Sequence, residues 1–163
     1  MNFDAAHILH VMPQRYPMLL IDRFEALPDP ERGLAFKNIT LNEPCYQHVQ
    51  GTPVADEMLA YPLALLLESF GQGVGLLLSQ QGFLAQTQEQ WAVVFGEFTG
   101  IEVKGGAYPG DRLRHEIKLD LVSSTMAVAS GETRVGERSI ASYRSIKVFR
   151  VTHATLVGEL SDA

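Results

Sequence analysis

The sequence predicts one α+β domain, in which a long buried helix packs against a strongly curved antiparallel sheet of five or six strands. The chain has 163 residues, of which 46% are hydrophobic and 20% are charged, a balance typical of one globular domain and not of a disordered chain. Residues 58–78 form an apolar run with a single charge, and most of the second half has the residue pattern of β-strands. Together these observations favour a helix and a sheet that share one core.

The N-terminal part predicts a short helix followed by two strands. Asp4 is suited to cap a helix over residues 5–11, because its carboxylate can accept hydrogen bonds from the first free N–H groups, and Pro13 ends the helix. Residues 19–27 and 34–40 are rich in strand-forming residues and are joined by a turn-rich segment. They are therefore expected to pair.

A long loop and then the apolar helix are expected next. Residues 41–58 contain many polar and helix-breaking residues, which predicts a functional loop. The helix is expected over residues 62–79, with the fixed φ of the proline at its start suited to a first helical turn. Gly71, Gly73 and Gly75 lie within it, and each costs roughly 1 kcal/mol relative to Ala. We expect their missing side chains to let the sheet or a partner approach the helix.

The alternative for residues 58–78 is a membrane span, because the run has the required length. Pro62 and Glu68 stand against it, since an acidic residue near the middle costs roughly 2.5 to 3.5 kcal/mol on insertion scales. A helix that a sheet surrounds on most sides is equally apolar. We therefore expect a core helix and no contact with a membrane.

Strands are expected through most of the second half, over residues 91–103, 112–122, 125–134 and 138–150. In the second of these, apolar side chains share one face and charged side chains the other, so one side should face solvent. The apolar face consists of Leu113, Ile117, Leu119 and Leu121. The domain is expected to span residues 1–150, and residues 151–163 are expected to form a C-terminal tail.

Composition excludes several classes of function. The formal charge of -6 repels phosphates, so nucleic acid is not an expected partner. The lone Cys45 cannot form an intrachain disulfide, and no spacing of Cys and His indicates a metal site. The N-terminus lacks the basic segment and apolar run of a signal peptide. These features predict a cytoplasmic protein.

Glu68 is the first candidate for chemistry, because it is the only charged side chain between Met58 and Gln80. Apolar neighbours would deprive its carboxyl group of hydration, which favours a protonated group that can donate near neutral pH. The alternative is that Glu68 faces a gap filled with solvent, or a partner Arg, and only anchors packing. Gln72 lies one turn further on the same face and can hydrogen-bond to Glu68 or to a ligand.

His48 is the second candidate, in a loop rich in Pro and Gly. A neutral imidazole can act as a general base when it reaches an acidic proton, and paired with Glu68 it would supply the base and acid that an elimination requires. The alternative is an ordinary surface histidine on a loop. That is also what we expect for the other histidines, which are His7, His10, His115 and His153.

A series of short motifs runs along the chain between residues 12 and 150. They are MPQRYPMLLIDR (12–23), KNITLNEP (37–44), HVQGTPV (48–54), YPLALLLESFGQ (61–72), FGEFTG (95–100) and YPGDRL (108–113). In this order they resemble the hot-dog-fold 3-hydroxyacyl-[acyl-carrier-protein] dehydratases. The resemblance implies the hot-dog fold, in which a curved antiparallel sheet wraps a long central helix.

The resemblance also implies a reaction. A lyase of this family removes water reversibly from a 3-hydroxyacyl thioester to give a trans-2-enoyl thioester, in fatty acid or related acyl-chain biosynthesis. The family's catalytic residues map onto His48, which would remove the C2 proton, and Glu68 of the other subunit, which would protonate the departing C3 hydroxyl. The N-terminus of the central helix would stabilise the thioester oxygen. No cofactor or metal is implied.

Partners and substrate contacts follow from the same resemblance. The substrate would be a thioester of acyl carrier protein or CoA, held in an apolar tunnel between the subunits of a homodimer or a trimer of dimers. The residues expected to contact the substrate are Pro53, Leu63, Gln72, Phe95 and Gly96.

The loop departs from the family pattern. Gln47 stands where the family has Gly, or one residue is missing after Tyr46, and the Phe-Pro pair after the histidine is absent. The segment before the helix is longer, and Leu63 replaces a Gly, so a Cβ would hinder close approach of the thioester carbonyl. Two alternatives therefore stay open: a catalytically weak hot-dog protein that binds acyl groups or serves as a partner subunit, and a hot-dog thioesterase that uses Asp56 or Glu57.

Overall fold

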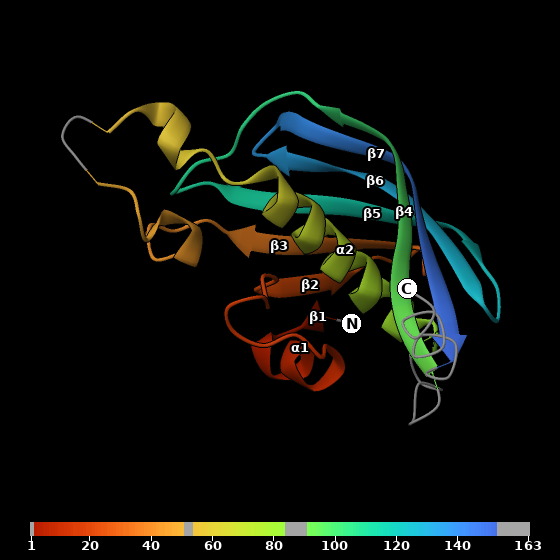
Figure 1. The fold of residues 1–163 in the computed structure, drawn as a ribbon. Helices are drawn as coiled ribbons and strands as arrows, with labels where there is room; N and C mark the ends of the chain where they lie inside the picture. The colour runs from red at the N-terminus through yellow and green to blue at the C-terminus, as the bar shows by residue number, and fades with distance from the viewer. Residues whose placement is uncertain (1, 51–53, 84–90, 153–163) are drawn as a thin grey trace, which may run out of the picture.

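A seven-stranded antiparallel sheet curves around one long helix, α2 (Leu63–Gln80), as Figure 1 shows. The structure is a computed structural model and describes residues 2–50, 54–83 and 91–152. The strand order is β1-β2-β3-β5-β6-β7-β4. The strands are β1 (Asn2–Phe3), β2 (Arg23–Ala26), β3 (Arg32–Asn38), β4 (Trp91–Val103), β5 (Arg112–Val122), β6 (Met126–Val135) and β7 (Arg138–Thr152). The shorter elements are helix α1 (Ala5–Val11) and the 3₁₀ turns η1 (Pro44–Tyr46) and η2 (Asp56–Leu59). The predicted α+β class is confirmed.

Helix α1 forms where the sequence predicts it. The Asp4 carboxylate accepts a hydrogen bond of 2.9 Å from the backbone N–H of His7, which satisfies one free donor of the first turn. Beyond the other end, the Arg15 guanidinium donates to the carbonyls of Met12 (2.6 Å) and Leu9 (3.0 Å). Arg15 therefore closes the C-terminal end of this helix.

Helix α2 begins one residue later than predicted. Pro62 has ψ of 134° and lies at the N-cap position, where its carbonyl accepts from the N–H of Leu66 at 3.0 Å. The segment Asp56–Gln80 is long and apolar enough to cross a membrane by length and composition alone. However, 61% of its 18-residue apolar stretch is buried inside the protein. Phe70, for example, packs its ring 3.9 Å from that of Tyr143 on the sheet. This burial favours the predicted core helix.

Gly73 lies where α2 packs directly against the sheet. A Cβ at this position would lie 2.6 Å from Cδ1 of Ile117 and 2.8 Å from Cβ of Ala35, too close for a real side chain. At Gly75 the nearest neighbour is the flexible end of Met12, 3.6 Å away, which is an ordinary contact. The predicted role of the glycines is therefore confirmed at Gly73, and Gly75 has room for a methyl group.

The predicted apolar face of β5 is correct except at one end. Its other members are buried, but Leu121 is 46% exposed. The pairing of β5 with β6 shifts register between Leu119 and Leu121, and a one-residue shift turns a side chain to the opposite face. The expectation that Leu121 faces the core is therefore wrong.

Several strand boundaries also differ from expectation; β3, for example, spans Arg32–Asn38 and not residues 34–40. Strand β2 starts only at Arg23, because the backbone N–H of Leu20 donates to the side chain of Gln72 and not to a neighbouring strand. Strand β7 continues to Thr152, so the sheet includes the first residues of the predicted tail. The rest of that tail, residues 153–163, lies outside the described residues.

His115 is fully buried on the inner face of β5, so the expectation of a surface histidine is wrong here. Its Nδ1 lies 2.8 Å from Oγ1 of Thr133, which lies 2.9 Å from the hydroxyl of Tyr143. Burial lowers the pKa of His115 to about 3 and raises that of Tyr143 to about 12, so both rings are neutral. The sequence contained the signal, because position 115 alternates with Leu113 and Ile117 on the apolar face.

Candidate active site

Three of the sequence motifs meet at one end of the sheet. The Asp22 carboxylate accepts from the backbone N–H (2.6 Å) and the side-chain amide (3.0 Å) of Asn38. Next to it, the N–H of Ile39 donates to the carbonyl of Asp111, and the N–H of Gly110 donates to the carbonyl of Ile39, each at 2.9 Å. The segment between β3 and α2 leaves the sheet at this end, and the N-terminus of α2 returns to it (Figure 1).

Glu68 is half-buried on the first half of α2, and Gln72 fixes its carboxylate. The side-chain amide of Gln72 donates to Oε1 of Glu68 at 2.7 Å and to the carbonyl of Met18 at 2.6 Å. The carbonyl oxygen of the same side chain accepts from the N–H of Leu20 at 2.9 Å. Because Gln72 is only 2% exposed, these contacts tie the carboxylate to the chain segment before β2. The predicted hydrogen bond between the two residues is present, while contact of Gln72 with substrate stays a prediction.

Phe95 places an aromatic ring beside the same region of α2. Its Cε1 lies 3.5 Å from where a Cβ would stand on Gly71, an ordinary contact distance, so the ring lies directly over this part of the helix. Gly71 lies three residues after Glu68 and therefore on a neighbouring part of the helix surface. The ring is 36% exposed. A half-buried carboxylate thus stands near an aromatic surface that is partly open.

His48 lies in the loop that follows η1 and is exposed. The N–H of the next residue, Val49, donates to the carbonyl of Tyr46 at 3.0 Å. Within the described residues of this single chain, no hydrogen bond or ion pair joins His48 to Glu68. The pairing of these two candidate catalytic groups therefore stays a prediction. Pro53, a predicted substrate contact, lies outside the described residues.

The sequence matches the model of the FabA-like domain over residues 12–144, which is most of the chain. The chain belongs to the FabA-like family. It is 34% identical over 135 residues to the 3-hydroxyacyl-[acyl-carrier-protein] dehydratase FabZ of Acidovorax sp. (strain JS42), covering 82% of this chain and 88% of that protein. It is 29% identical over 143 residues to FabZ of Clostridium kluyveri (strain ATCC 8527 / DSM 555 / NBRC 12016 / NCIMB 10680 / K1), covering 86% and 92% of the two chains.

Solved structures show the hot-dog fold. The dehydratase heterocomplex ApeI:P from Xenorhabdus doucetiae is similar with a TM-score of 0.72 and 11% identity, over 94% of this chain and 96% of that chain. A hot-dog-like protein from Thermanaerovibrio acidaminovorans gives a TM-score of 0.58 and 13% identity, over 80% and 88%. The predicted fold and the predicted family are both confirmed.

Leu63 and Gly96, two of the predicted substrate contacts, lie in α2 and β4 of this FabA-like chain. Leu63 is the first residue of α2 and is 47% exposed. The N-cap residue Pro62 offers no side-chain acceptor to the first turn, whose N–H groups form the positive end of the helix. Gly96 lies where the pairing of β4 with β7 shifts register, and a Cβ there would stand 2.5 Å from the ring of Phe149. Gly96 therefore has a packing role next to Phe95.

Sequence reasoning did not identify the ion pair that lies where the His48 loop leaves β3. Lys37 and Glu43 form a salt bridge in which the two side chains are only 7% and 13% exposed. Both residues belong to the motif KNITLNEP. The match of this motif to the family pattern was the signal in the sequence that could have identified them. A lysine and a glutamate are usually solvated, so neither stood out by residue type.

Nothing in the described ranges 2–50, 54–83 and 91–152 forms a group of three His, Cys, Asp or Glu side chains that could hold a metal ion. A pocket of about 200 Å³ lies at the C-terminal end of α2 and is lined by residues that include Gln81, Phe83 and Arg150. Glu68 lies toward the other end of the helix, so this pocket is separate from the candidate site.

Proposed function

We propose that the protein is a hydro-lyase that dehydrates 3-hydroxyacyl thioesters carried by acyl carrier protein, in the biosynthesis of fatty acids or related acyl chains. The observation that carries the proposal is the carboxyl group of Glu68, held by Gln72 at 2.7 Å, in a chain 34% identical to a FabZ dehydratase. The Phe95 ring lies against Gly71, three residues further along the same helix. A fixed carboxyl group next to an apolar surface is suited to give a proton to a leaving hydroxyl group.

In the proposed reaction, His48 removes the C2 proton, which the neighbouring thioester carbonyl makes acidic. The electron pair of that C–H bond forms the C2–C3 double bond, and the C3–O bond breaks. Glu68 gives its proton to the departing oxygen, which leaves as water. The free N–H groups in the first turn of α2 stabilise the negative charge on the thioester oxygen while the proton is moving. The residues of this chain thus supply a base, an acid and an oxyanion site.

We infer that the site is completed by a second copy of the chain. Within the described residues of one chain, no hydrogen bond or ion pair joins His48 to Glu68. Among the described strands, β4 lies at the edge of the sheet and pairs only with β7, so one side of a 13-residue strand is open to pairing. Phe95 lies on this strand, beside α2. A homodimer would place His48 of one copy with Glu68 of the other, and further assembly would give a trimer of dimers.

The substrate-binding and location assignments belong to the same proposal. Pro53, Leu63, Gln72, Phe95 and Gly96 are proposed to contact the acyl thioester, with acyl carrier protein as the main carrier and CoA thioesters as accepted analogues. The helix that could have spanned a membrane serves as the core helix, which supports a cytoplasmic enzyme.

Hydration of crotonyl-CoA and crotonyl-carrier protein, followed by loss of enoyl absorbance, tests the proposal. His48→Ala and Glu68→Gln should each lower kcat/KM at least ~100-fold, the lower end of general acid–base contributions. His10→Ala, which changes an exposed histidine on α1, serves as the matched control and should keep wild-type activity. Full activity in both site variants would rule out the assigned roles.

Co-expression of the two inactive variants tests the shared site. A mixed dimer has one site with both substitutions and one site with neither. With random pairing, roughly a quarter of wild-type sites should therefore be restored. If His48 and Glu68 of the same chain formed each site, mixing would restore nothing.

A further inference from the structure

We propose that the buried Lys37–Glu43 ion pair, together with Tyr46, is the device that holds the His48 loop in place for the reaction. The inference rests on the proposed role of His48 and adds three positioning residues to it. None of the three is proposed to touch the substrate.

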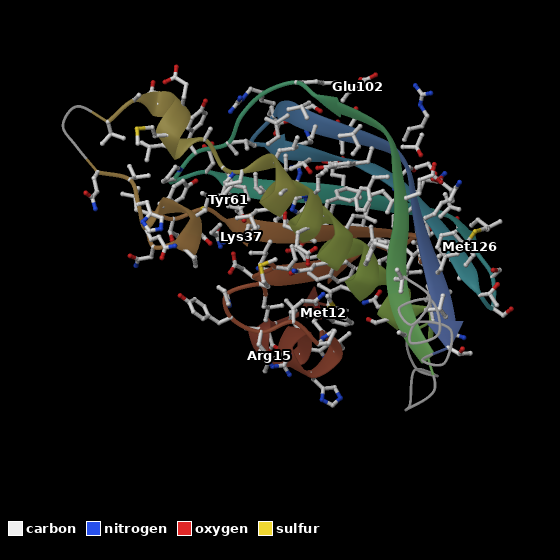
Figure 2. The ribbon with its side chains drawn as sticks, viewed as in Figure 1. Met12, Arg15, Lys37, Tyr61, Glu102 and Met126 are labelled. Atoms are coloured by element: carbon white, nitrogen blue, oxygen red, sulfur yellow. The ribbon has the colours of Figure 1, made fainter. Side chains whose placement is uncertain are left out.

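Lys37 is buried at the end of β3, which is unusual for a lysine. Its ammonium group forms an ion pair with the carboxylate of Glu43 and also donates to the carbonyl of Asn38 at 2.6 Å. Figure 2 shows Lys37 at the end of the sheet from which the loop departs. Because a charge this deep is stable only with its partner, the pair fixes Glu43 to the sheet.

Glu43 is also the residue from which the His48 loop starts. Its backbone carbonyl accepts from the N–H of Tyr46 at 3.0 Å, within η1. The N–H of Gln47 then donates to Pro44 at 3.2 Å, and the N–H of Val49 donates to Tyr46 at 3.0 Å. The chain on both sides of His48 is thus folded in successive turns, and their position depends on Glu43.

Tyr46 connects the two arms of the loop, the first arm containing η1 and His48 and the second arm containing η2. The residue is 6% exposed, and its hydroxyl donates to the carbonyl of Leu59 in η2 at 3.1 Å. The second arm is in turn attached to the domain, since the N–H of Tyr61 donates to the carbonyl of Ala107 at 2.8 Å. Both arms are therefore anchored, one by the ion pair and one by the backbone, and Tyr46 joins them.

The consequence for catalysis follows from how strongly proton transfer depends on geometry. A displacement of ~1 Å in a reacting group can cost about 100-fold in rate. His48 is exposed and has no side-chain hydrogen bond in the described structure, so its position depends on the backbone on either side of it. Loosening the anchors should lower kcat without changing how the acyl chain binds.

Amide hydrogen exchange measured by NMR tests the anchor independently of activity. In Lys37→Met and in Tyr46→Phe, the amides of Gln47 and Val49 should exchange at least ~10-fold faster, while amides inside α2 such as Val74 keep their protection. The exchanged pair Lys37→Glu with Glu43→Lys should restore protection to within ~3-fold, because the attraction is preserved. The control Lys118→Met breaks an exposed ion pair with Asp120 and should change nothing at these amides.

Kinetics on the same variants separates positioning from folding. Lys37→Met and Tyr46→Phe should lower kcat for crotonyl-CoA hydration by roughly 10- to 100-fold with KM within about twofold, and the exchanged pair should recover kcat. Unchanged exchange at Gln47 and Val49, or faster exchange with unchanged kcat, would overturn the inference. If the wild-type protein shows no hydratase activity, the proposed function fails, whereas the exchange rates still decide whether these residues hold the loop.

Discussion

The side-chain amide of Gln72 donates to Oε1 of Glu68 across 2.7 Å, from one turn further along the same buried helix. The same amide nitrogen donates to Met18, and the amide oxygen accepts from Leu20. A single glutamine therefore sets the distance between the proposed acid and the segment before β2. The rotamer of Glu68 is fixed before any substrate arrives, which favours a precise proton transfer.

Gln72→Leu should weaken both activity and stability. The substitution leaves the N–H of Leu20 and the carbonyl of Met18 without partners, which costs about 1 to 3 kcal/mol in the free energy of unfolding. It also frees the Glu68 carboxylate, so kcat should fall at least ~10-fold. Urea unfolding and the hydration assay measure the two effects. Gln80→Leu, at the other end of α2, is the control, and an equal loss in both variants would contradict the role of Gln72.

Gly73→Ala and Gly75→Ala should have opposite effects on stability. The Cβ at position 73 would collide with Ile117 and Ala35, so we expect a loss of about 1 to 3 kcal/mol. At position 75 the neighbour is the flexible Met12, so the better helix propensity of Ala should add up to ~1 kcal/mol. Thermal unfolding of the two variants and the wild type measures the difference. Equal destabilisation by both substitutions would show that α2 packs tightly along its whole length.

Features determined by local sequence were predicted closely. The long helix begins at Leu63, one residue after the predicted start, because a proline disfavours helical backbone in the residue before it and so keeps the helix from starting earlier. The exposed side chain of Leu121 could not be predicted, because a register shift between two strands turns it outward. Such a shift depends on a neighbouring strand, whereas residue alternation is a property of one strand only.

The same distinction applies to the candidate site. The contact between Gln72 and Glu68 was predictable, since residues four apart share a helix face. The buried pair of Lys37 and Glu43 was not, because burial of two charges depends on how the loop folds over the end of β3. We propose that His48 meets Glu68 of a second copy of the chain, a relationship that no periodicity in one sequence encodes.

The burial of His115 should make stability fall in acid. The folded protein keeps the ring neutral, with a pKa of about 3, whereas the unfolded chain takes up a proton near pH 6.5. The stabilisation is therefore complete above pH 6.5 and is lost as pH falls from there toward 3, by roughly 1.4 kcal/mol for each unit. The unfolding free energy at pH 7, 6 and 5, measured in urea, should show this slope.

His115→Gln should be less stable than the wild type at pH 7, because it disturbs the contacts with Thr133 and Phe70. The difference between the two proteins should then shrink as pH falls, since the variant has no buried ring to protect from protonation. His10→Gln, on the exposed face of α1, should keep the wild-type slope. Parallel slopes for His115→Gln and the wild type would contradict the assignment of a neutral buried histidine.

Asp56→Asn and Glu57→Gln should leave hydration of crotonyl-CoA within about twofold of wild type, which separates a dehydratase from the thioesterase alternative. Both carboxylates lie in η2 and are exposed, so each exchanges its water with bulk solvent. Within the described residues, no side-chain hydrogen bond or ion pair holds either of them to position a nucleophile. A thioesterase would release free thiol from the same substrate, and one of these substitutions would stop the release. We expect no thiol release above the blank by the wild-type protein, measured with a thiol-reactive dye. If the wild-type protein released thiol and Asp56→Asn or Glu57→Gln abolished that release, the catalytic carboxylate would be the one in the loop and not Glu68.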